Sequence, residues 1–191
     1  MVITMTLSKT SINAAKKQLR AAKRTLKEKC EEFVNELAKI GITVAEGNSG
    51  YWGKYLMFSR DVSQSRYGAK AIMSGNYTQL VARSWKVMDE GEETIKTVFV
   101  NPLLMAEFGS GKFASDAAGT KNAEYASKYG AGRGTFYGQT HAMQDEGWSW
   151  KTLDDEWVHS YGETPSMPMY SAYEQMMADV QRIARQVFGT L

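Results

Sequence analysis

The sequence has little of what usually reveals a compartment or a membrane. It contains one cysteine, Cys30, so no disulfide can form within the chain, which is typical of a reducing compartment. No apolar run approaches the roughly 18 residues that a membrane-spanning helix needs. The first residues also lack the apolar stretch and cleavage site of a secretory signal. We therefore expect a soluble cytoplasmic product with no membrane partner.

Patterns for nucleotide binding are incomplete. The run 109–112 (Gly-Ser-Gly-Lys) resembles part of a phosphate-binding loop, which needs Gly five positions before the Gly-Lys pair and Ser or Thr after it. Ala106 and Phe113 occupy those two positions. The alternating glycines of 130–134 lack the strand–turn–helix setting of a dinucleotide loop. We predict no nucleotide cofactor.

Metal ligands and nucleophiles are also scarce. The two histidines, His141 and His159, are eighteen positions apart, whereas structural zinc usually needs several Cys or His at tight spacing. We predict structural, hydrogen-bonding roles for both. Cys30 lies on the apolar side of a predicted helix, which predicts a buried and unreactive thiol. The sequence therefore predicts no metal site, no cofactor, no catalytic residue and no enzymatic activity.

The composition that remains is that of an ordinary globular protein. The chain has 191 residues, of which 43% are hydrophobic and 23% are charged, enough for one well-buried core. We predict a single domain, 1–191, of the α+β class. It combines an antiparallel sheet of about four or five strands with a long N-terminal helix, a C-terminal helix and a long loop rich in glycine and aromatic residues.

Residues 8–40 are predicted to form the N-terminal helix. Gly41 would end it. Apolar side chains recur every seven residues along this stretch, and we expect the stripe to face the core. The stripe consists of Ile12, Leu19, Leu26, Phe33 and Ile40.

Charge is distributed unevenly along the chain. Residues 1–40 carry nine Lys or Arg and four Glu, a net charge of +5, while the whole chain has +2. The cations occupy the first half of the predicted helix, where the helix dipole disfavours them. They form either a solvated face or a basic face that docks on a partner. This candidate docking face comprises Lys16, Lys17, Arg20, Lys23, Arg24 and Lys27.

Residues 42–101 are predicted to be mainly strands. A short strand at 42–46 leads to turn residues at 47–50, and the clearest strand is Thr94–Asn101, rich in β-branched residues. Gly75-Asn76 resembles a hairpin turn, and 89–93 a charged turn. Pro102 then suits the first turn of a short helix at 102–108.

The last part of the chain is predicted to be a loop at 109–166 and a helix at 167–188. The loop has seven glycines between 109 and 146, and a segment this long in a compact domain is usually functional. Three of the five tryptophans lie in it: Trp148, Trp150 and Trp157. Such large side chains bury either against the chain's own core or against a partner. The sequence leaves both alternatives open.

Five short motifs occur in order along the second half of the chain. They are Ala-Glu-Phe-Gly-Ser-Gly at 106–111, Gln-Thr-His at 139–141, Gly-Trp-x-Trp at 147–150, Trp-x-His-Ser-Tyr-Gly at 157–162 and Pro-x-Met-Pro-Met-Tyr at 165–170. From about Thr94 onward, the chain resembles the gene-product-ten family of tailed-phage neck proteins, which comprises tail-completion and head–tail joining proteins. The first ninety residues resemble the family only in the order of their elements.

The resemblance implies a structural virion protein. It would form a ring, six-fold in the family, at the junction of head and tail. Its partners would be copies of itself, the neighbouring neck and tail-tube rings, and genomic DNA passing through the lumen. The protein would be found in the host cytoplasm during assembly and in the virion afterwards. The resemblance assigns as motif and candidate interface residues Glu107, Phe108, Gly109, Gln139, Thr140, His141, Trp148, Trp150, Trp157, His159, Tyr161, Pro165, Met167, Pro168 and Tyr170.

Two other functions stay open. The first is a different ring of the same neck, either a tail terminator or a stopper. The second is a nucleic-acid-binding accessory protein that uses the basic helix, for which salt-dependent DNA binding by the monomer would be the signature.

Overall fold

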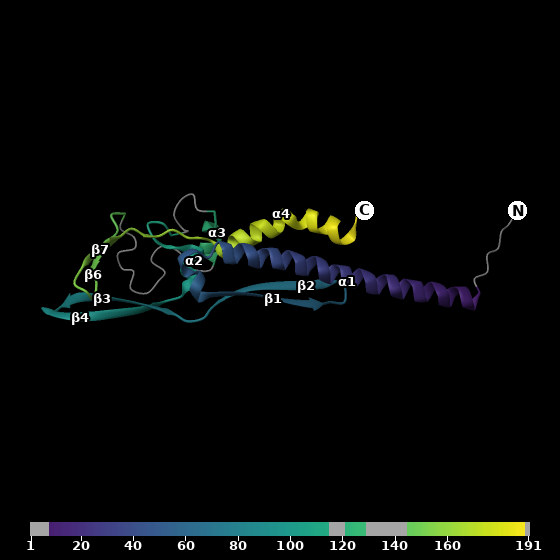
Figure 1. Ribbon diagram of the computed structural model, residues 1–191, viewed down its shortest axis with the longest axis horizontal. Helices are drawn as coiled ribbons and strands as arrows, with labels where there is room; N and C mark the ends of the chain where they lie inside the picture. The colour runs from purple at the N-terminus through teal and green to yellow at the C-terminus, as the bar shows by residue number, and fades with distance from the viewer. Residues whose placement is uncertain (1–7, 115–120, 129–144, 190–191) are drawn as a thin grey trace.

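One long helix forms the axis of the helical part of the molecule (Figure 1). In the computed structural model, which describes residues 8–114, 121–128 and 145–189, this helix is α1 (Lys9–Gly47). Its 39 residues correspond to a length of about 58 Å. Ser8 caps it, because its Oγ accepts a hydrogen bond from the Ser11 N–H at 3.2 Å.

The helix does not end at Gly41, and the predicted strand at 42–46 is wrong. Gly41 is buried within α1, and a Cβ there would lie 2.7 Å from the Met176 sulfur and 2.8 Å from the Met73 sulfur. The glycine is therefore needed for close packing on two sides rather than for a helix end. The helix continues to Gly47, and the Asn48 N–H bonds the Val44 carbonyl at 3.0 Å.

The helical part has three layers. The helix α4 (Pro168–Phe188) lies on one side of α1, and the hairpin of β1 (Leu56–Gln64) and β2 (Ala69–Tyr77) lies on the other (Figure 1). The predicted boundary of 167 for the last helix is moved by one residue, to Pro168.

The first hairpin turn is not at Gly75-Asn76, as predicted, but at 65–68. Both predicted turn residues lie inside β2 and pair with Phe58 and Met57 of β1. A Cβ on Gly75 would lie 3.1 Å from the Met169 sulfur, so this glycine too makes room for packing. A glycine that forms a turn and a glycine that makes room for a neighbouring side chain cannot be distinguished from the sequence alone.

The other hairpin is where the charged turn was predicted. Strands β3 (Val81–Asp89) and β4 (Glu92–Val100) join through Glu90 and Gly91, whose φ angles of 50° and 91° suit a type I′ turn. Strands β6 (Trp148–Lys151) and β7 (Trp157–Ser160) extend them into an antiparallel sheet in the order β4-β3-β6-β7. This sheet lies at the opposite end of the molecule from the start of α1 (Figure 1).

The main core lies between these two parts. Trp52, from the 3₁₀ helix η1 (Gly50–Tyr55), packs with Val100 at the end of β4 and with Met105 and Ala106 of α2 (Pro102–Phe108). The helix α2 begins where Pro102 predicted it, and the Asn101 side chain caps it by accepting from Leu103 N–H at 2.9 Å.

The segment 109–166 is not one long loop. Its described residues include β5 (Ser110–Gly111), α3 (Ala123–Lys128), β6, β7 and β8 (Gly162–Glu163), which pairs with β5. Short strands of two to four residues leave too little periodicity to be predicted from sequence. The glycines between 130 and 138, together with Gln139, Thr140 and His141, lie outside the described residues.

The chain is thus α+β, with a long N-terminal helix, a four-stranded antiparallel sheet and a C-terminal helix, as predicted. The helix α1 packs between α4 on one side and the β1–β2 hairpin on the other. Among the described residues, no helix has the length and apolarity needed to cross a membrane.

Candidate functional site

Two of the sequence motifs meet at the joint between the helical part and the sheet. Glu107 of α2 points at the start of α4, where its carboxylate accepts hydrogen bonds from the N–H groups of Met169 at 2.8 Å and Tyr170 at 3.0 Å. Met167, the residue before the helix, has a φ of 54° and makes no side-chain cap, and Pro168 has no N–H to offer. Glu107 therefore caps α4 from another helix.

The residue Glu107 is 8% exposed, and its burial raises the pKa of the carboxyl above the usual 4.5. The hydrogen bonds from Met169, Tyr170 and the Asn122 side chain oppose that rise. Asn122, fully buried, also donates to the Glu107 carbonyl at 2.6 Å. Its enclosure and its bonds to two N–H groups at the start of α4 indicate a structural role for this carboxyl.

The glycines beside this joint permit close backbone contacts. Gly109 has a φ of 64°, and a Cβ there would lie 2.3 Å from the Glu163 carbonyl oxygen and 2.8 Å from Pro165. Gly111 lies under the ring of Trp148, and a Cβ on Gly111 would lie 2.7 Å from a carbon of that ring. The residues of the motifs at 106–111 and 165–170 are therefore explained by their role in holding the fold together.

One face of the four-stranded sheet is left uncovered by the part of the chain that the structure describes. We call it the open face and define it by four large apolar side chains, each more than three-fifths exposed. These are Met88 (70%), Ile95 (62%), Phe99 (64%) and Trp157 (73%). Such an apolar face on a folded protein is typical of an interaction surface.

The strand register places these residues together. Ile95 is directly opposite Lys86, Lys86 is opposite Lys151, and Lys151 is opposite Trp157, so the four form one row across the sheet. Directly opposite residues point to the same face, and so do residues two apart on a strand. By the same rule, Phe99 and Met88 share the face of Ile95.

The two lysines in this row share two acids. Lys86 Nζ lies 3.0 Å from Glu93 and 2.8 Å from Asp155, and Lys151 Nζ lies 3.3 Å and 2.6 Å from the same two groups. The bonds from Lys151 and then Lys86 lower the pKa of Asp155 from 3.8 to about 2. This four-charge network cancels the repulsion between facing lysines and ties the two hairpins together.

Exposed acids lie at two turns of the sheet, and we call them the turn acids. They belong to the β3–β4 turn and the β6–β7 turn, which the four-charge network holds together. The turn acids are Asp89, Glu90, Glu92, Asp154 and Glu156. Asp89 and Glu92 form the pair next to Met88 and Glu93, so they point away from the open face. Lys96 is nearby, 4.0 Å from Asp89.

The three predicted tryptophans fall on different faces. Trp148 and Trp150 alternate with Ser149 and Lys151, so they lie on the opposite side of the sheet from Trp157. Both are half-buried, and Trp148 covers Gly111. Trp157 alone of the three is exposed on the open face.

The other predicted site residues are placed as follows. His159 is exposed, and its Nδ1 lies 2.8 Å from the Ser149 hydroxyl on the neighbouring strand. Its ring packs edge-on against Tyr161 at 4.8 Å. Phe108 is buried, and Tyr170 packs against Tyr125 at 5.7 Å. These contacts hold the strands and helices together.

The basic residues predicted for docking lie at the far end of the molecule. Residues 9–26 of α1, which we call the N-terminal arm, are exposed throughout and extend beyond the other layers (Figure 1). The prediction that the apolar stripe faces the core is wrong here, because Ile12, Leu19 and Leu26 are 38%, 71% and 56% exposed. Only from Phe33, which meets Phe188 at 5.8 Å, does the stripe pack.

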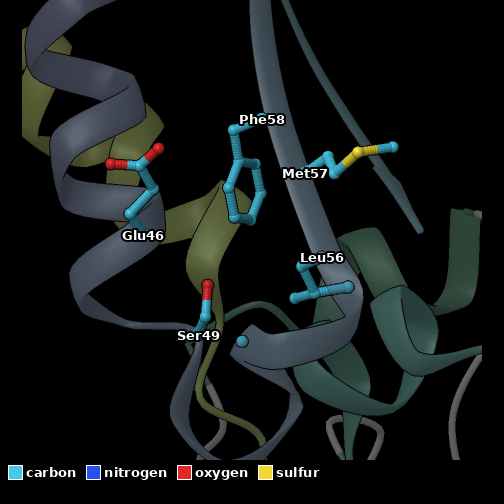
Figure 2. Close-up of a pocket in the computed structure, with 6 residues that line it drawn as sticks. Glu46, Ser49, Leu56, Met57 and Phe58 are labelled. Atoms are coloured by element: carbon cyan, nitrogen blue, oxygen red, sulfur yellow. The ribbon is translucent and has the colours of Figure 1, made fainter. Parts of the chain in front are cut away.

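The hollows on the described surface hold few side chains suited to catalysis or metal binding. Figure 2 shows Glu46 at the end of α1 facing Leu56 and Phe58 of β1 across a hollow that Ser49 and Gly53 also line. Ser49 Oγ is already bound to the Ala45 carbonyl at 2.7 Å. Among the described residues, no three His, Cys, Asp or Glu gather as metal ligands would.

Sequence reasoning missed the open face and its network. Ile95 and Phe99 lie on one face of the predicted strand Thr94–Asn101, so part of an apolar face was visible, but not that it would stay uncovered. Met88 lay in no predicted strand. Lys86 and Asp155 are 69 residues apart, and only the β3–β6 pairing brings them together. No family model, no curated protein and no solved structure matches the chain.

Proposed function

We propose that this chain is a structural virion protein of a tailed bacteriophage or prophage. It forms a ring in the neck, completes the tail and joins it to the head. The observation that carries the proposal is the ordered set of five motifs between 106 and 170, which resembles the gene-product-ten neck proteins. Its mechanism is assembly rather than catalysis.

Two structural features support this function. The motif residues Glu107, Gly109 and Pro165 form the joint between the sheet and the helices, so the resembling half of the chain is one connected structural unit. The molecule also offers an uncovered surface at each end, the N-terminal arm and the open face. A subunit that must contact several neighbours needs more than one such surface.

The test is to delete the gene from the phage or prophage genome that encodes the chain. We expect filled heads and finished tails to accumulate separately in electron micrographs, and purified protein to restore joined particles. Joined particles without the gene would overturn the proposal. Tails of uncontrolled length would instead indicate a terminator, and emptied heads a stopper.

The nucleic-acid-binding alternative is favoured by one observation. The N-terminal arm carries six Lys or Arg and no Asp or Glu, and all of it is exposed. Binding of the purified chain to a DNA duplex, measured against salt, distinguishes the two. A steep loss of affinity with salt, together with normal head–tail joining in the deletion strain, would support the alternative.

A further inference from the structure

We infer that the N-terminal arm binds the phosphate backbone of duplex DNA. The contact is electrostatic and independent of base sequence, and it uses the cations of the arm rather than its aliphatic side chains. The inference goes beyond the joining function, because a chain can complete a neck without holding DNA itself. It is carried by how the cations are arranged, by what surrounds them and by what else the arm contains.

Five cations form one row along α1. Lys16, Arg20 and Lys23 are separated by four and three residues, so they lie on one face of the helix. Lys9 lies seven residues before this group and Lys27 four residues after it, and both continue the row. At 1.5 Å per residue, the row is about 27 Å long. The arm therefore presents a continuous line of positive charge.

The chain itself does not neutralise this line. Residues 9–26 contain no Asp or Glu. Within the part of the chain that the structure describes, Arg24 alone of the arm's six cations forms an ion pair, with Glu28 at 3.7 Å. The other elements do not cover the arm, which extends beyond α4 and the β1–β2 hairpin (Figure 1). The repulsion between cations three or four residues apart is therefore relieved only by charge from another molecule.

The position of the row in the helix also favours an anionic partner. The N-terminus is the positive end of the helix dipole, and α1 has no acidic residue in its first turn. Cations at this end destabilise the isolated helix, whereas anions are stabilised there. A phosphate backbone along the arm would interact favourably with both the cations and the dipole.

A duplex supplies enough charge for the whole row. It carries one negative charge per about 1.7 Å of its axis. Lys16 and Lys27 are eleven residues apart, which corresponds to about 16 Å of helix and about ten phosphates of a duplex lying alongside. The row thus suits a continuous polyanion.

The composition of the arm does not suit a protein partner. Protein–protein interfaces are enriched in Tyr, Trp and Phe and depleted in Lys. The arm contains four lysines and no aromatic residue. DNA-binding surfaces, in contrast, use Lys and Arg for most of their contacts to phosphate.

A membrane surface fits the arm less well than DNA does. Helices that lie in a membrane interface bury a broad apolar face, commonly with Trp, Phe and Leu. The large apolar side chains of the arm are Ile12, Leu19 and Leu26, which form a single line seven residues apart. We therefore commit to DNA and treat membrane binding as an outcome of the test.

The experiment measures binding of the full chain to a fluorescently labelled DNA duplex at several salt concentrations. The arm variant carries Lys16→Gln, Arg20→Gln and Lys23→Gln. All three positions are exposed, and glutamine has nearly the helix propensity of lysine and arginine, so the variant should melt as the wild type does.

The matched control removes the same amount of charge elsewhere. It carries Lys54→Gln, Lys96→Gln and Lys121→Gln, all at exposed positions outside α1. The ion pairs of Lys96 with Asp89 at 4.0 Å and of Lys121 with Glu174 at 3.9 Å are exposed and long, so their loss should not change the melting temperature.

We expect the wild-type affinity for the duplex to fall steeply with salt. Each phosphate contact contributes about −0.9 to the slope of log K against log salt, so the arm variant should lose about 2.7 from the magnitude of that slope. At low salt it should also bind at least about tenfold more weakly. The control variant should keep the wild-type slope. Leu19→Ser should bind the duplex as the wild type does, because the aliphatic line is not part of the contact.

A wild type that does not bind the duplex would overturn the inference. So would equal slopes for the arm variant and the control variant, because net charge alone would then explain binding. Binding to phosphatidylserine vesicles that Leu19→Ser abolishes, without binding to the duplex, would assign the arm to a membrane surface instead. The proposed function is tested separately. A chain that restores head–tail joining but does not bind DNA would refute only this inference, and one that binds DNA through the arm without restoring joining would refute only the neck function.

Discussion

The Glu107 carboxylate accepts a hydrogen bond from the Met169 N–H at 2.8 Å and thereby closes the first turn of a helix that begins sixty-one residues later in the sequence. Glu107→Ala would leave the Met169 and Tyr170 N–H groups without this acceptor. We expect it to lower the free energy of unfolding by about 1–3 kcal/mol. Chemical denaturation measures the change, and Glu46→Ala, at an exposed position on α1, should stay within about 0.5 kcal/mol of wild type.

A second prediction concerns Gly41 and its matched control, Gly47. A Cβ at Gly41 would approach the sulfurs of Met176 and Met73 within 2.8 Å, whereas nothing lies within 4 Å of one at Gly47. We expect Gly41→Ala to destabilise the protein by about 1–2 kcal/mol, despite alanine's better helix propensity. Gly47→Ala should be neutral or slightly stabilising. Equal melting temperatures for the two variants would show that α4 and the β1–β2 hairpin do not pack closely against Gly41.

The pH dependence of stability should report on Asp155. Its pKa is lowered from 3.8 to about 2, so the folded state binds this proton less tightly than the unfolded state does. The stability it contributes is therefore fully present above pH 3.8 and is lost as the pH falls toward 2. Thermal melts in acid should show this loss in the wild type and a smaller loss in Asp155→Asn.

Asparagine is the suitable replacement at this position. Asp155 has a φ of 66°, which asparagine tolerates better than most residues, so the variant removes the charge and keeps the turn. Asp154→Asn, on the exposed neighbour in the same turn, should keep the wild-type profile. If the wild type and Asp155→Asn lose stability in parallel, the four-charge network does not hold the two hairpins together.

The tryptophans should separate association from stability. Trp157 is 73% exposed on the open face, so Trp157→Ala should weaken self-association and head–tail joining while the subunit melts normally. Trp148 covers Gly111 from the other side of the sheet, so Trp148→Ala should cost about 2–3 kcal/mol of folding stability, somewhat less than for a fully buried tryptophan. The opposite pattern, a melting shift for Trp157 and none for Trp148, would contradict this assignment of faces.

Some features of the fold were predictable because their cause is local. Pro102 has no N–H and a fixed φ, so a helix start at that residue was predictable. The run 94–101 was predictable as a strand from its β-branched residues, and the charged turn at 89–93 from its acids and Gly91. A periodic helix with its cations in the first half was also predictable, and α1 is that helix.

The glycines show where local rules stop. Gly41 and Gly75 look like a helix end and a turn, because glycine is common at both. In the structure each lies in the middle of an element. Gly41 lies against the sulfur of Met176 and Gly75 against the sulfur of Met169, and both methionines are more than ninety residues further along the chain. Their role depends on which side chains pack on them, and sequence order does not contain that information.

The sequence by itself determined the two long helices and the strand at 94–101, which residues carry charge, and that an apolar line runs along the first helix. Only the tertiary structure decided which of those apolar residues are covered. Phe33 packs against Phe188, whereas Leu19, with the same periodicity, extends past the end of α4 and stays exposed. The physical reason is that periodicity reports the direction of a side chain on its own element, while burial depends on whether another element reaches that position.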